Sequence, residues 1–289
     1  MNATSDPFTD IFNVNNTLGS WVIWLIRAIE STNQYSLLNQ TLLFSVAAAI
    51  AAYLLYFIFC SLSYYIFFMR YKEYYRPDSQ PQPFKGQVQA EITMTIWTVP
   101  VIALMTAPWL VAEMRGYSKL YLYDPTVSWW TVAATVVWFI VFTDSCIYWI
   151  HRWEHTFPWI YKNIHKPHHR WLVPTPFAAL AFHPVDGYAQ SIPYHLFVFL
   201  FPMNVFLYFG LFFFVQLWTI GIHDSVDFIG GKYGSLISQV INGSMHHTIH
   251  HSKFLYNYGQ YFTFWDRAFG SHYEPDLDYE NKQNAKKIN

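Results

Sequence analysis

Charged side chains are scarce in this sequence of 289 residues, since Asp, Glu, Lys and Arg make up only 12% of it, against roughly 25% in a soluble globular protein. Apolar residues make up 53% and aromatic residues 21%. The formal net charge is −1, which offers no field for a polyanion. This composition excludes a disordered chain, a coiled coil and a basic nucleic-acid-binding protein, and it requires burial in lipid or in an unusually large core.

Cysteine is also scarce. The two cysteines, Cys60 and Cys146, both lie in apolar runs, which excludes a disulfide framework and a zinc site made of cysteines. The sequence also lacks a Gly-x-Gly-x-x-Gly motif, so we expect no directly bound nicotinamide cofactor.

Long apolar runs are abundant. Residues 42–68, 92–112, 127–150 and 192–222 each reach the roughly 20 residues that a membrane-spanning helix needs. The last run is too long for one crossing and short for two, so we expect a helical hairpin that turns at 201–204. The sequence therefore predicts an all-α membrane protein with about four transmembrane segments. A soluble protein with a buried helical core is the alternative that these runs disfavour.

Basic residues are unevenly distributed along the chain. They are sparse in residues 1–40 but frequent in 69–91 and directly after residue 150. Because basic loops stay on the cytosolic side, we expect a luminal N-terminus and a cytosolic region from His151 onward, with the hairpin returning the chain to the cytosol.

The two ends of the chain agree with this orientation. The first ten residues are acidic and do not resemble a cleavable signal peptide, and residues 21–29 are expected at the membrane interface. Sequons at Asn2, Asn15 and Asn39 would face the lumen. The terminal Lys286-Lys287 pair looks like a dilysine endoplasmic-reticulum retrieval signal, which acts from the cytosol; an ordinary basic tail is the alternative.

Histidine is strongly clustered. Nine of the 13 histidines fall within residues 151–169 and 246–251. A first box, with histidines four residues apart, continues from the third apolar run, and two further boxes share the pattern His-x-x-His-His. The boxed residues are His151, His155, His165, His168, His169, His247, His250 and His251. Spacings of three and four turn the rings of a box to one side of a helix.

The boxes predict a metal centre. Eight imidazoles exceed the four ligands that one structural zinc ion needs, so we expect two metal ions with about four histidines each. Imidazole suits iron, zinc and copper. Pro167 fits poorly in a helix interior, so we place it in the first turn of a helix, with His165 just before it. Isolated histidines are usually hydrogen-bonded core residues, but three repeated boxes are not explained in that way.

Residues outside the boxes could complete the centre. His183 and His223 are candidates for a ninth or tenth ligand, whereas His195 and His272 are not expected to bind metal. Asp144 shares the helical face of the first box, and we expect its carboxylate to accept the second ring N–H of a metal-bound histidine. Asp186, Asp224, Asp227 and Asp266 are weaker candidates for the same role.

The doublet His246-His247 leaves two frames for the third box. In the second box the residue before the first histidine is Ile164, which cannot bind metal. Alignment of the two boxes therefore selects His247 as the ligand and leaves His246 at the edge of the face, as a neighbour of the ligands.

Beyond the boxes, the sequence contains Tyr148-Trp-Ile-His-Arg152, Ala181-Phe-His-Pro-Val-Asp-Gly187 and Tyr256-Asn-Tyr-Gly-Gln-Tyr-Phe-Thr-Phe-Trp-Asp-Arg267. Together with the order of the boxes, these stretches resemble the fatty acid hydroxylase/sterol desaturase superfamily over roughly residues 41–275. The three boxes identify only the superfamily. The last stretch makes the sequence similar to the sterol C-5 desaturases within it.

This resemblance implies a non-haem membrane oxidase that contains two iron ions, with zinc as a substitute in purified protein; the dilysine pair places it in the endoplasmic reticulum. Such an enzyme introduces the C5=C6 double bond into a Δ7-sterol, consumes dioxygen, and receives electrons from NAD(P)H through cytochrome b5 and its reductase. The division of the chain would then be a luminal segment 1–40, three spans in 41–150, a first catalytic segment 151–191, a membrane hairpin 192–222, and a second catalytic segment with the tail 223–289.

Two alternatives remain at this point. One is a related hydroxylase or methyl oxidase that acts on a sterol or a fatty acyl chain. The other, from a different class, is a metal transporter or a haem-binding membrane protein. A haem protein would place paired histidines in the middle of the membrane on facing helices, whereas here the histidines cluster at the ends of the apolar runs.

Overall fold

The computed structural model describes residues 28, 31–76, 81–122, 124, 126–226 and 235–273. It is built almost entirely of helices, as the sequence predicts. In chain order the elements are η1 (Ser31–Gln34), α3 (Leu37–Tyr64), η2 (Tyr65–Arg70), α4 (Lys72–Tyr75), α5 (Gln87–Met114), β1 (Leu120–Tyr121), α6 (Trp129–Thr156), α7 (Pro158–Ile160), η3 (Tyr161–His165), η4 (His168–Arg170), η5 (Pro176–Leu180), α8 (Pro184–Leu200), β2 (Met203–Asn204), α9 (Val205–Ile222), α10 (Ser244–Lys253) and α11 (Phe264–Ala268).

Four helical segments are long and apolar enough to cross a membrane: α3 continued by η2, then α5, α6 and α9. Each overlaps one of the four apolar runs predicted from the sequence. Capping side chains define where three of them begin. Ser36 accepts a hydrogen bond from the backbone of Asn39 at the start of α3, and Ser128 does the same for Thr131 at the start of α6. Asn204 caps α9.

The expected hairpin is confirmed, with its turn between α8 and α9. Strand β2 lies in the turn and pairs in parallel with β1, with Leu120 opposite Met203. The first arm begins at Pro184 rather than at residue 192, because Pro184 occupies the first helical position and His183 caps the helix. The extra turns carry Asp186 to the end of the bundle where the histidines lie.

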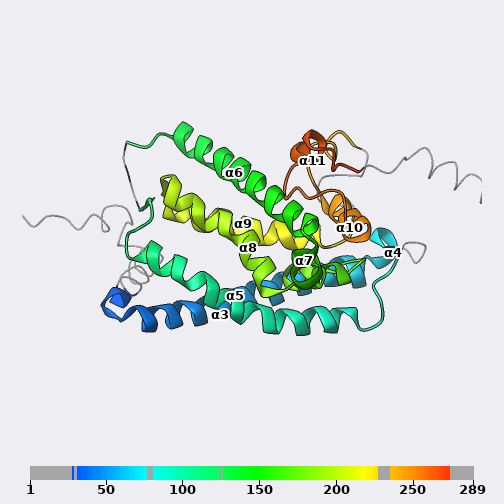
Figure 1. The fold of residues 1–289 in the computed structure, drawn as a ribbon, viewed down its shortest axis with the longest axis horizontal. Coiled ribbons are helices and arrows are strands. Elements are labelled where there is room, and N and C mark those ends of the chain that lie inside the picture. The colour runs from blue at the N-terminus through cyan, green and yellow to red at the C-terminus, as the bar shows by residue number, and fades with distance from the viewer. Residues whose placement is uncertain are drawn as a thin grey trace, which may run out of the picture.

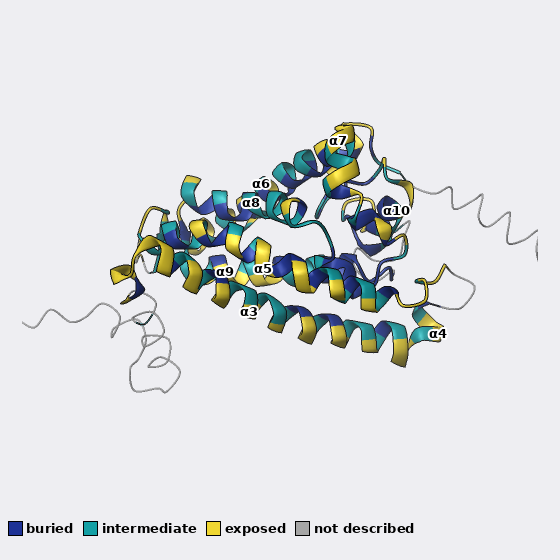
Figure 2. Ribbon diagram, turned by 60° about the horizontal axis from the view of Figure 1, so that its bottom comes forward, coloured by how far each residue is buried: buried dark blue, intermediate teal, exposed yellow. Residues whose placement is uncertain are grey.

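The long helices form a bundle in which α3 packs along α5, and α6 packs along α8 (Figure 1). The outer face of α3 is exposed along its length (Figure 2). That face carries Leu42, Val46, Ile50 and Leu54, each exposed and spaced by four residues. An apolar face of this extent is suited to lipid.

The interior of the bundle is aromatic. Phe139 on α6 and Phe197 on α8 are both fully buried, with ring centroids 5.1 Å apart in an edge-to-face arrangement. Val198 and Met203 join the same core. This packing fixes α6 against the hairpin, and therefore fixes the first histidine box against Asp186.

Beyond α6, the short helices form a cap at one end of the bundle (Figure 1). Trp171 is fully buried there, and its indole N–H donates to the carbonyl of Ala181 at 2.9 Å. Asp266 accepts hydrogen bonds from the backbone of Tyr258 and Gly259. A Cβ on Gly259 would collide with the carbonyl oxygen of Phe262, so only glycine fits this loop.

The second histidine box differs from its expected form. His165 ends the π-helical turn η3, and Pro167 precedes η4, a 3₁₀ helix of three residues. The regular helix expected after Pro167 does not form, because the backbone leaves helical geometry at Trp171, with φ −90° and ψ 74°, after a single 3₁₀ turn. His168 and His169 consequently point in different directions.

Several expectations concern residues outside the described ranges. These are most of the interfacial stretch 21–29, the sequons at Asn2 and Asn15, Asp227, and the Lys286-Lys287 pair. Asn39 is described and is exposed in the first turn of α3.

Candidate metal centre

The boxed histidines meet at the end of the bundle where α6 leaves it. Helix α6 carries the first box, η3 and η4 carry the second, and α10 carries the third. His223, directly after α9, joins them. These nine histidines form two groups. Within each group, one ring nitrogen of every residue lies within 4.8 Å of the corresponding nitrogens of the others: His151, His155, His165, His169 and His250 in group A, and His168, His223, His247 and His251 in group B.

The two groups are interleaved. Neighbouring residues of the second box separate, with His168 in group B and His169 in group A. The third box also divides, since His250 lies in group A while His247 and His251 lie in group B. Neither group can therefore form without both of these boxes in place.

In group A, ring nitrogens face one another without enough protons between them. His169 Nε2 lies 3.1 Å from His155 Nε2 and 3.0 Å from His165 Nε2. His165 Nδ1 lies 2.8 Å from a carboxylate oxygen of Asp186, and because a carboxylate only accepts, Nδ1 carries the proton and Nε2 presents a lone pair. A cation among these nitrogens satisfies them all.

The remaining members of group A are oriented by backbone carbonyls. His151 Nδ1 lies 3.0 Å from the oxygen of Tyr258, and His250 Nδ1 lies 2.7 Å from that of Tyr256. Their buried Nε2 atoms have no hydrogen-bond partner among the described residues. Unpaired buried nitrogens are costly, and here they point to a metal ion as the partner.

Group B repeats this arrangement. His247 Nε2 lies 3.0 Å from His223 Nε2 and 3.1 Å from His251 Nε2, and His168 Nε2 lies 3.4 Å from His223 Nε2. His223 Nδ1 contacts the carbonyl of Thr219 at 2.7 Å, so its Nε2 presents a lone pair to the group.

Burial keeps these imidazoles neutral. Burial and the neighbouring His223 lower the pKa of His168 to about 3, and burial lowers the pKa of His223 to about 4. Both rings are therefore unprotonated near pH 7, which is the form that binds metal. The donor set, neutral nitrogen without thiolate, fits two redox-active or hydrolytic metal ions better than a cysteine-type structural site.

Two buried carboxylates, Asp186 and Glu154, lie next to His165 of group A. The sequence predicted only Asp186 for this position. Asp186 contacts His165, as proposed for a carboxylate that orients a ligand. Glu154 lies 3.7 Å from the same Nδ1 atom. The amide of Gln190 donates to both carboxylates, at 2.7 Å to Asp186 and 3.1 Å to Glu154. Glu154 lies within the first box, and an acidic residue inside a run of ligands was the signal that could have identified it.

The expected role of Asp144 is wrong. Its carboxylate accepts from the backbone N–H of Tyr261 at 2.7 Å and of Phe262 at 3.3 Å. Helix α6 turns Asp144 toward the loop that precedes α11, while the carbonyl of Tyr258 takes the second N–H of His151. Asp144 therefore holds the loop whose Tyr258 carbonyl contacts His151.

Two further aspartates also have roles other than the one considered for them. Asp224 accepts from the hydroxyl of Ser63 at 2.7 Å and so links α3 to the residue after His223. Asp266 pins the loop that carries Tyr258.

Histidines outside the three boxes, and His246, differ in whether they join the two groups. His183 lies outside both groups, where its Nδ1 accepts from the backbone of Val185 as a helix cap. His246 is buried but also lies outside both groups, with its ring centroid 5.8 Å from that of His272. His195 lies farther along α8, with Nδ1 3.3 Å from Glu113. His223 is thus the ninth clustered histidine, while His183 is not brought to the centre.

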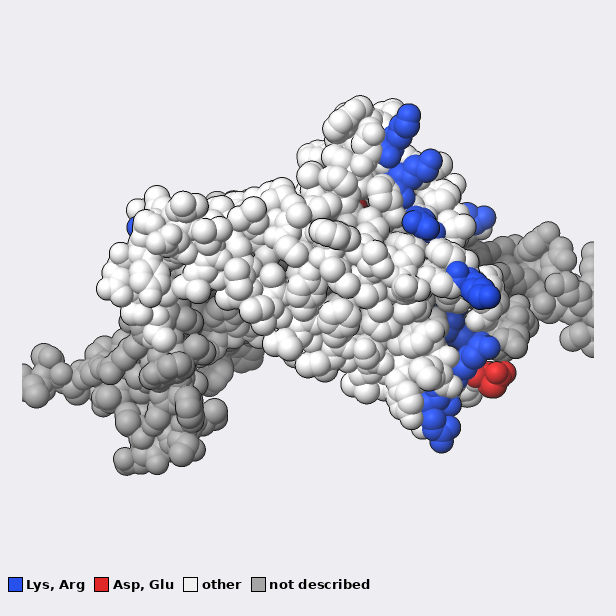
Figure 3. Space-filling view, turned by 90° about the horizontal axis from the view of Figure 1, so that it is seen from below, with Lys and Arg blue, Asp and Glu red and all other residues white. Residues whose placement is uncertain are grey.

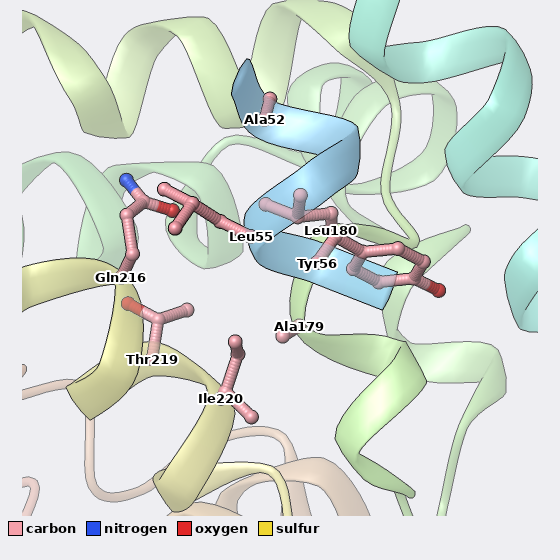
Figure 4. Close-up of a pocket in the computed structure, with 8 residues that line it drawn as sticks. All are labelled: Ala52, Leu55, Tyr56, Ala179, Leu180, Gln216, Thr219 and Ile220. Carbon is pink, nitrogen blue, oxygen red and sulfur yellow. The ribbon is translucent and has the colours of Figure 1, made fainter. Parts of the chain in front are cut away.

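A crevice on the lipid side adjoins group B. It lies between α3, η5 and α9 and is lined by Ala52, Leu55, Tyr56, Ala179, Leu180, Gln216, Thr219 and Ile220 (Figure 4). Leu180 precedes Ala181, whose carbonyl lies 3.4 Å from His168 Nδ1. The carbonyl of Thr219 contacts His223. One lining residue, Thr219, therefore contacts a histidine of group B directly, and another, Leu180, is the chain neighbour of a residue that contacts a second.

Comparison with known proteins gives a consistent result. The family model described as fatty acid hydroxylase matches residues 136–271, which include all nine clustered histidines. A Delta(7)-sterol 5(6)-desaturase of Gibberella zeae is 48% identical over 79% of this chain and 68% of its own length. Lathosterol oxidase of Mus musculus is 45% identical over 86% of this chain and 80% of its own length. A Delta(7)-sterol 5(6)-desaturase of Aspergillus fumigatus is 46% identical over 89% and 73%, respectively.

No solved structure matches the chain. The sequence relatives alone settle the family, because the identity is well above 40% and the alignments cover most of both proteins. The chain therefore belongs to the fatty acid hydroxylase and sterol desaturase family.

Proposed function

We propose that this protein is a sterol C-5(6) desaturase, which forms the C5=C6 double bond of a Δ7-sterol. The sterol loses one hydrogen from each of C-5 and C-6, and dioxygen, with two electrons and two protons from outside, is reduced to two molecules of water. The observation that carries the proposal is the meeting of two buried histidine groups at the end of a membrane bundle, in a chain 48% identical to a Delta(7)-sterol 5(6)-desaturase.

Iron is the metal we propose for both groups, with zinc as the ion that the same imidazoles would accept during purification. Group A would hold one ion and group B the other. When bound, the metal pair supplies an oxidant able to break an unactivated C–H bond, which no side chain can do.

The protein's own residues prepare the centre. Carbonyls of Tyr256, Tyr258 and Thr219 and the carboxylate of Asp186 fix the inner nitrogens by accepting the outer N–H groups. Burial of the histidines excludes bulk water, which would otherwise consume reactive species. The carboxylate pair of Asp186 and Glu154 also places acceptor groups directly behind group A.

The lipid-side crevice is where we propose that the sterol approaches. Its lining is apolar apart from Gln216, Thr219 and the hydroxyl of Tyr56 (Figure 4), which suits a large apolar molecule with one hydroxyl group. The route from lipid avoids transfer of the sterol through water. The crevice measures only about 10 Å³ in the structure, so helices α3 and α9 would have to separate as the substrate enters.

A partner protein is the proposed source of electrons. The sequence has no dinucleotide motif, and cytochrome b5 with its reductase would deliver electrons from NAD(P)H. Lys and Arg gather at the end of the molecule that carries the histidines (Figure 3). The exposed members include Arg70, Lys85, Lys162, Lys166 and Arg170. This basic end would attract a partner with an acidic surface.

We propose that the protein lies in the endoplasmic-reticulum membrane. The same basic end supports an orientation with the metal centre and C-terminus in the cytosol and the N-terminus in the lumen. The four long apolar helices make the protein multi-pass. The Lys286-Lys287 pair would act from the cytosol as a retrieval signal.

A hydroxylase is the second candidate, since the matching family model is described as fatty acid hydroxylase. The two reactions differ in product. Purified, iron-loaded protein given a Δ7-sterol, dioxygen and a reducing system should form a conjugated 5,7-diene, which absorbs near-ultraviolet light where the substrate does not. Accumulation of a 5- or 6-hydroxysterol would instead support the hydroxylase, and turnover without dioxygen would exclude both.

A further inference from the structure

A second hollow lies at the basic end of the molecule, apart from the metal centre. It measures about 280 Å³ and lies between the end of the first span, helix α4 and the start of α5. Its lining combines aromatic rings with cations, including Tyr64, Phe68, Lys72, Arg76 and Phe84. The space is several times the roughly 30 Å³ that one water molecule occupies, so it can hold a polar group of appreciable size.

Arg76 is the unusual member of this lining. Its side chain is only 2% exposed. Two of its nitrogens donate to backbone carbonyls, Nη1 to Ser225 at 2.9 Å and Nη2 to Pro81 at 3.1 Å. Its Nε is buried without a hydrogen-bond partner among the described residues, and its guanidinium carbon lies 4.6 Å from the centre of the Phe68 ring.

The charge of Arg76 has no direct counterion among the described residues. Asp224 is the acidic group that acts on it most strongly, but no ion pair joins the two, and the Asp224 carboxylate accepts from Ser63 instead. Burial lowers the pKa of Arg76 to about 10, so the residue stays charged near pH 7. A buried cation without a paired anion is costly, and an anion in the adjoining hollow would offset that cost.

The position of the hollow indicates the kind of anion. The first span ends at Arg70 and the second begins at Gln87, so the hollow lies where two spans leave the bilayer. Phospholipid phosphates lie at that level. Below the hollow, the first span exposes Leu54, Ile58 and Leu62, along which acyl chains can lie.

We propose that this hollow is a phosphate site that binds the head group of an anionic phospholipid, with Arg76 and Lys72 on the phosphate and the rings of Tyr64 and Phe68 against the glycerol. Basic pockets between spans on the cytosolic side recognise lipids through this chemistry. Arginine suits the role because its planar fork matches phosphate oxygens. A bound lipid would join α3, α4 and α5, and through Ser225 it would steady the segment after His223.

The test uses the full chain in lipid nanodiscs, with the midpoint of thermal unfolding as the readout. One preparation contains phosphatidylcholine alone, the second contains phosphatidylcholine mixed with phosphatidylglycerol, and the third contains phosphatidylcholine with inorganic phosphate added at matched ionic strength. The proposal predicts that phosphatidylglycerol raises the midpoint by several degrees, because a ligand that binds only the folded state stabilises it. A rise with inorganic phosphate of the same size would confirm the phosphate site but identify a free anion as its occupant.

Variants distinguish an effect of lipid binding in the hollow from an effect of general surface charge. Arg76→Gln should abolish the rise, and Lys72→Gln should reduce it while leaving the fold intact, since Lys72 is only half-buried. Lys162→Gln removes an exposed charge that does not line the hollow, and it should keep the full rise. An equal rise in all three variants, or none in the wild type, would overturn the proposal. Because unfolding is measured without substrate, this result is independent of the proposed reaction.

Discussion

At the scale of single residues, the proposed metal centre depends on which ring nitrogen of each histidine faces inward. Oxygens from carbonyls or a carboxylate hold Nδ1 of His151, His165, His223 and His250, and the Nε2 atoms of these residues face inward. The structure therefore gives the two nitrogens of each of these four rings different roles, and substitutions of neighbouring residues should have very different effects.

The doublet His246-His247 gives the sharpest contrast. We predict that His247→Gln lowers the bound metal from two equivalents to about one and abolishes activity, because His247 bridges two ligands of group B. His246→Gln should keep both equivalents and a measurable part of the activity, since His246 lies outside both groups, and loss of a supporting residue typically costs about 10–100-fold. Metal analysis with a turnover assay checks both. Equal and complete loss in the two variants would show that His246 is itself a ligand.

Asp186 and Asp144 form a second matched pair. Asp186→Asn should weaken metal binding by about 10–100-fold, because its charge orients His165. Asp144→Asn should instead lower the free energy of unfolding by about 1–3 kcal/mol while keeping the metal content, since Asp144 binds only backbone N–H groups in the described loop. Metal titration and thermal unfolding distinguish these results, and loss of metal in the Asp144 variant alone would contradict the assignment.

The sequence predicted that the eight boxed histidines would meet and that His247 rather than His246 would join them, and the structure brings them together in that way. It could not divide them between two metals, because His168 and His169 separate only in the 3₁₀ geometry of η4. It also misplaced Asp144, since helical spacing gives the face of a residue but not the loop that packs against that face.

At the scale of elements, the turns between helices determine which side chains reach the histidine groups. The hairpin turn at 201–204 followed from the length of the last apolar run, and the structure confirms it. The earlier start of α8, at Pro184, did not follow from hydropathy, because its first turns are polar. Those turns bring Asp186 and Gln190 to the centre.

The lipid-side crevice gives a prediction at this scale. Ala52 lines the crevice on α3, whereas the adjacent Ala51 is exposed and does not. Ala52→Phe should raise KM for the sterol about tenfold, which corresponds to about 1.4 kcal/mol of lost binding, with the metal content unchanged. Ala51→Phe adds the same ring toward lipid and should leave KM unaltered. Kinetics of both variants in the same vesicles provide the measurement, and identical KM values would exclude this crevice as the entrance.

At the scale of the whole molecule, the exposed basic residues and the histidine groups lie at the same end. Exposed lysines and arginines gather at the end of the molecule that carries α10 (Figures 1 and 3), while the long helices are apolar. This polarity follows directly from the sequence, because the basic segments 69–91 and 151–170 flank the spans.

Orientation in the membrane can be tested with a C-terminal tag. In intact microsomes, added protease should remove the tag, because the basic end is expected to stay in the cytosol. An N-terminal tag in the same vesicles serves as the control and should be protected until detergent is added. Protection of the C-terminal tag would reverse the proposed topology and the reading of Lys286-Lys287 as a retrieval signal.

The central claim is that two histidine-bound metals perform sterol C-5(6) desaturation. The most direct measurement is the sterol profile of cells that lack their own C-5 desaturase and express either this chain or its His247→Gln variant. The account predicts that the wild-type chain converts accumulated Δ7-sterols to 5,7-dienes, and that the variant, at equal protein level, does not. Unchanged Δ7-sterols with a well-expressed wild-type chain, or equal diene formation by the variant, would contradict it.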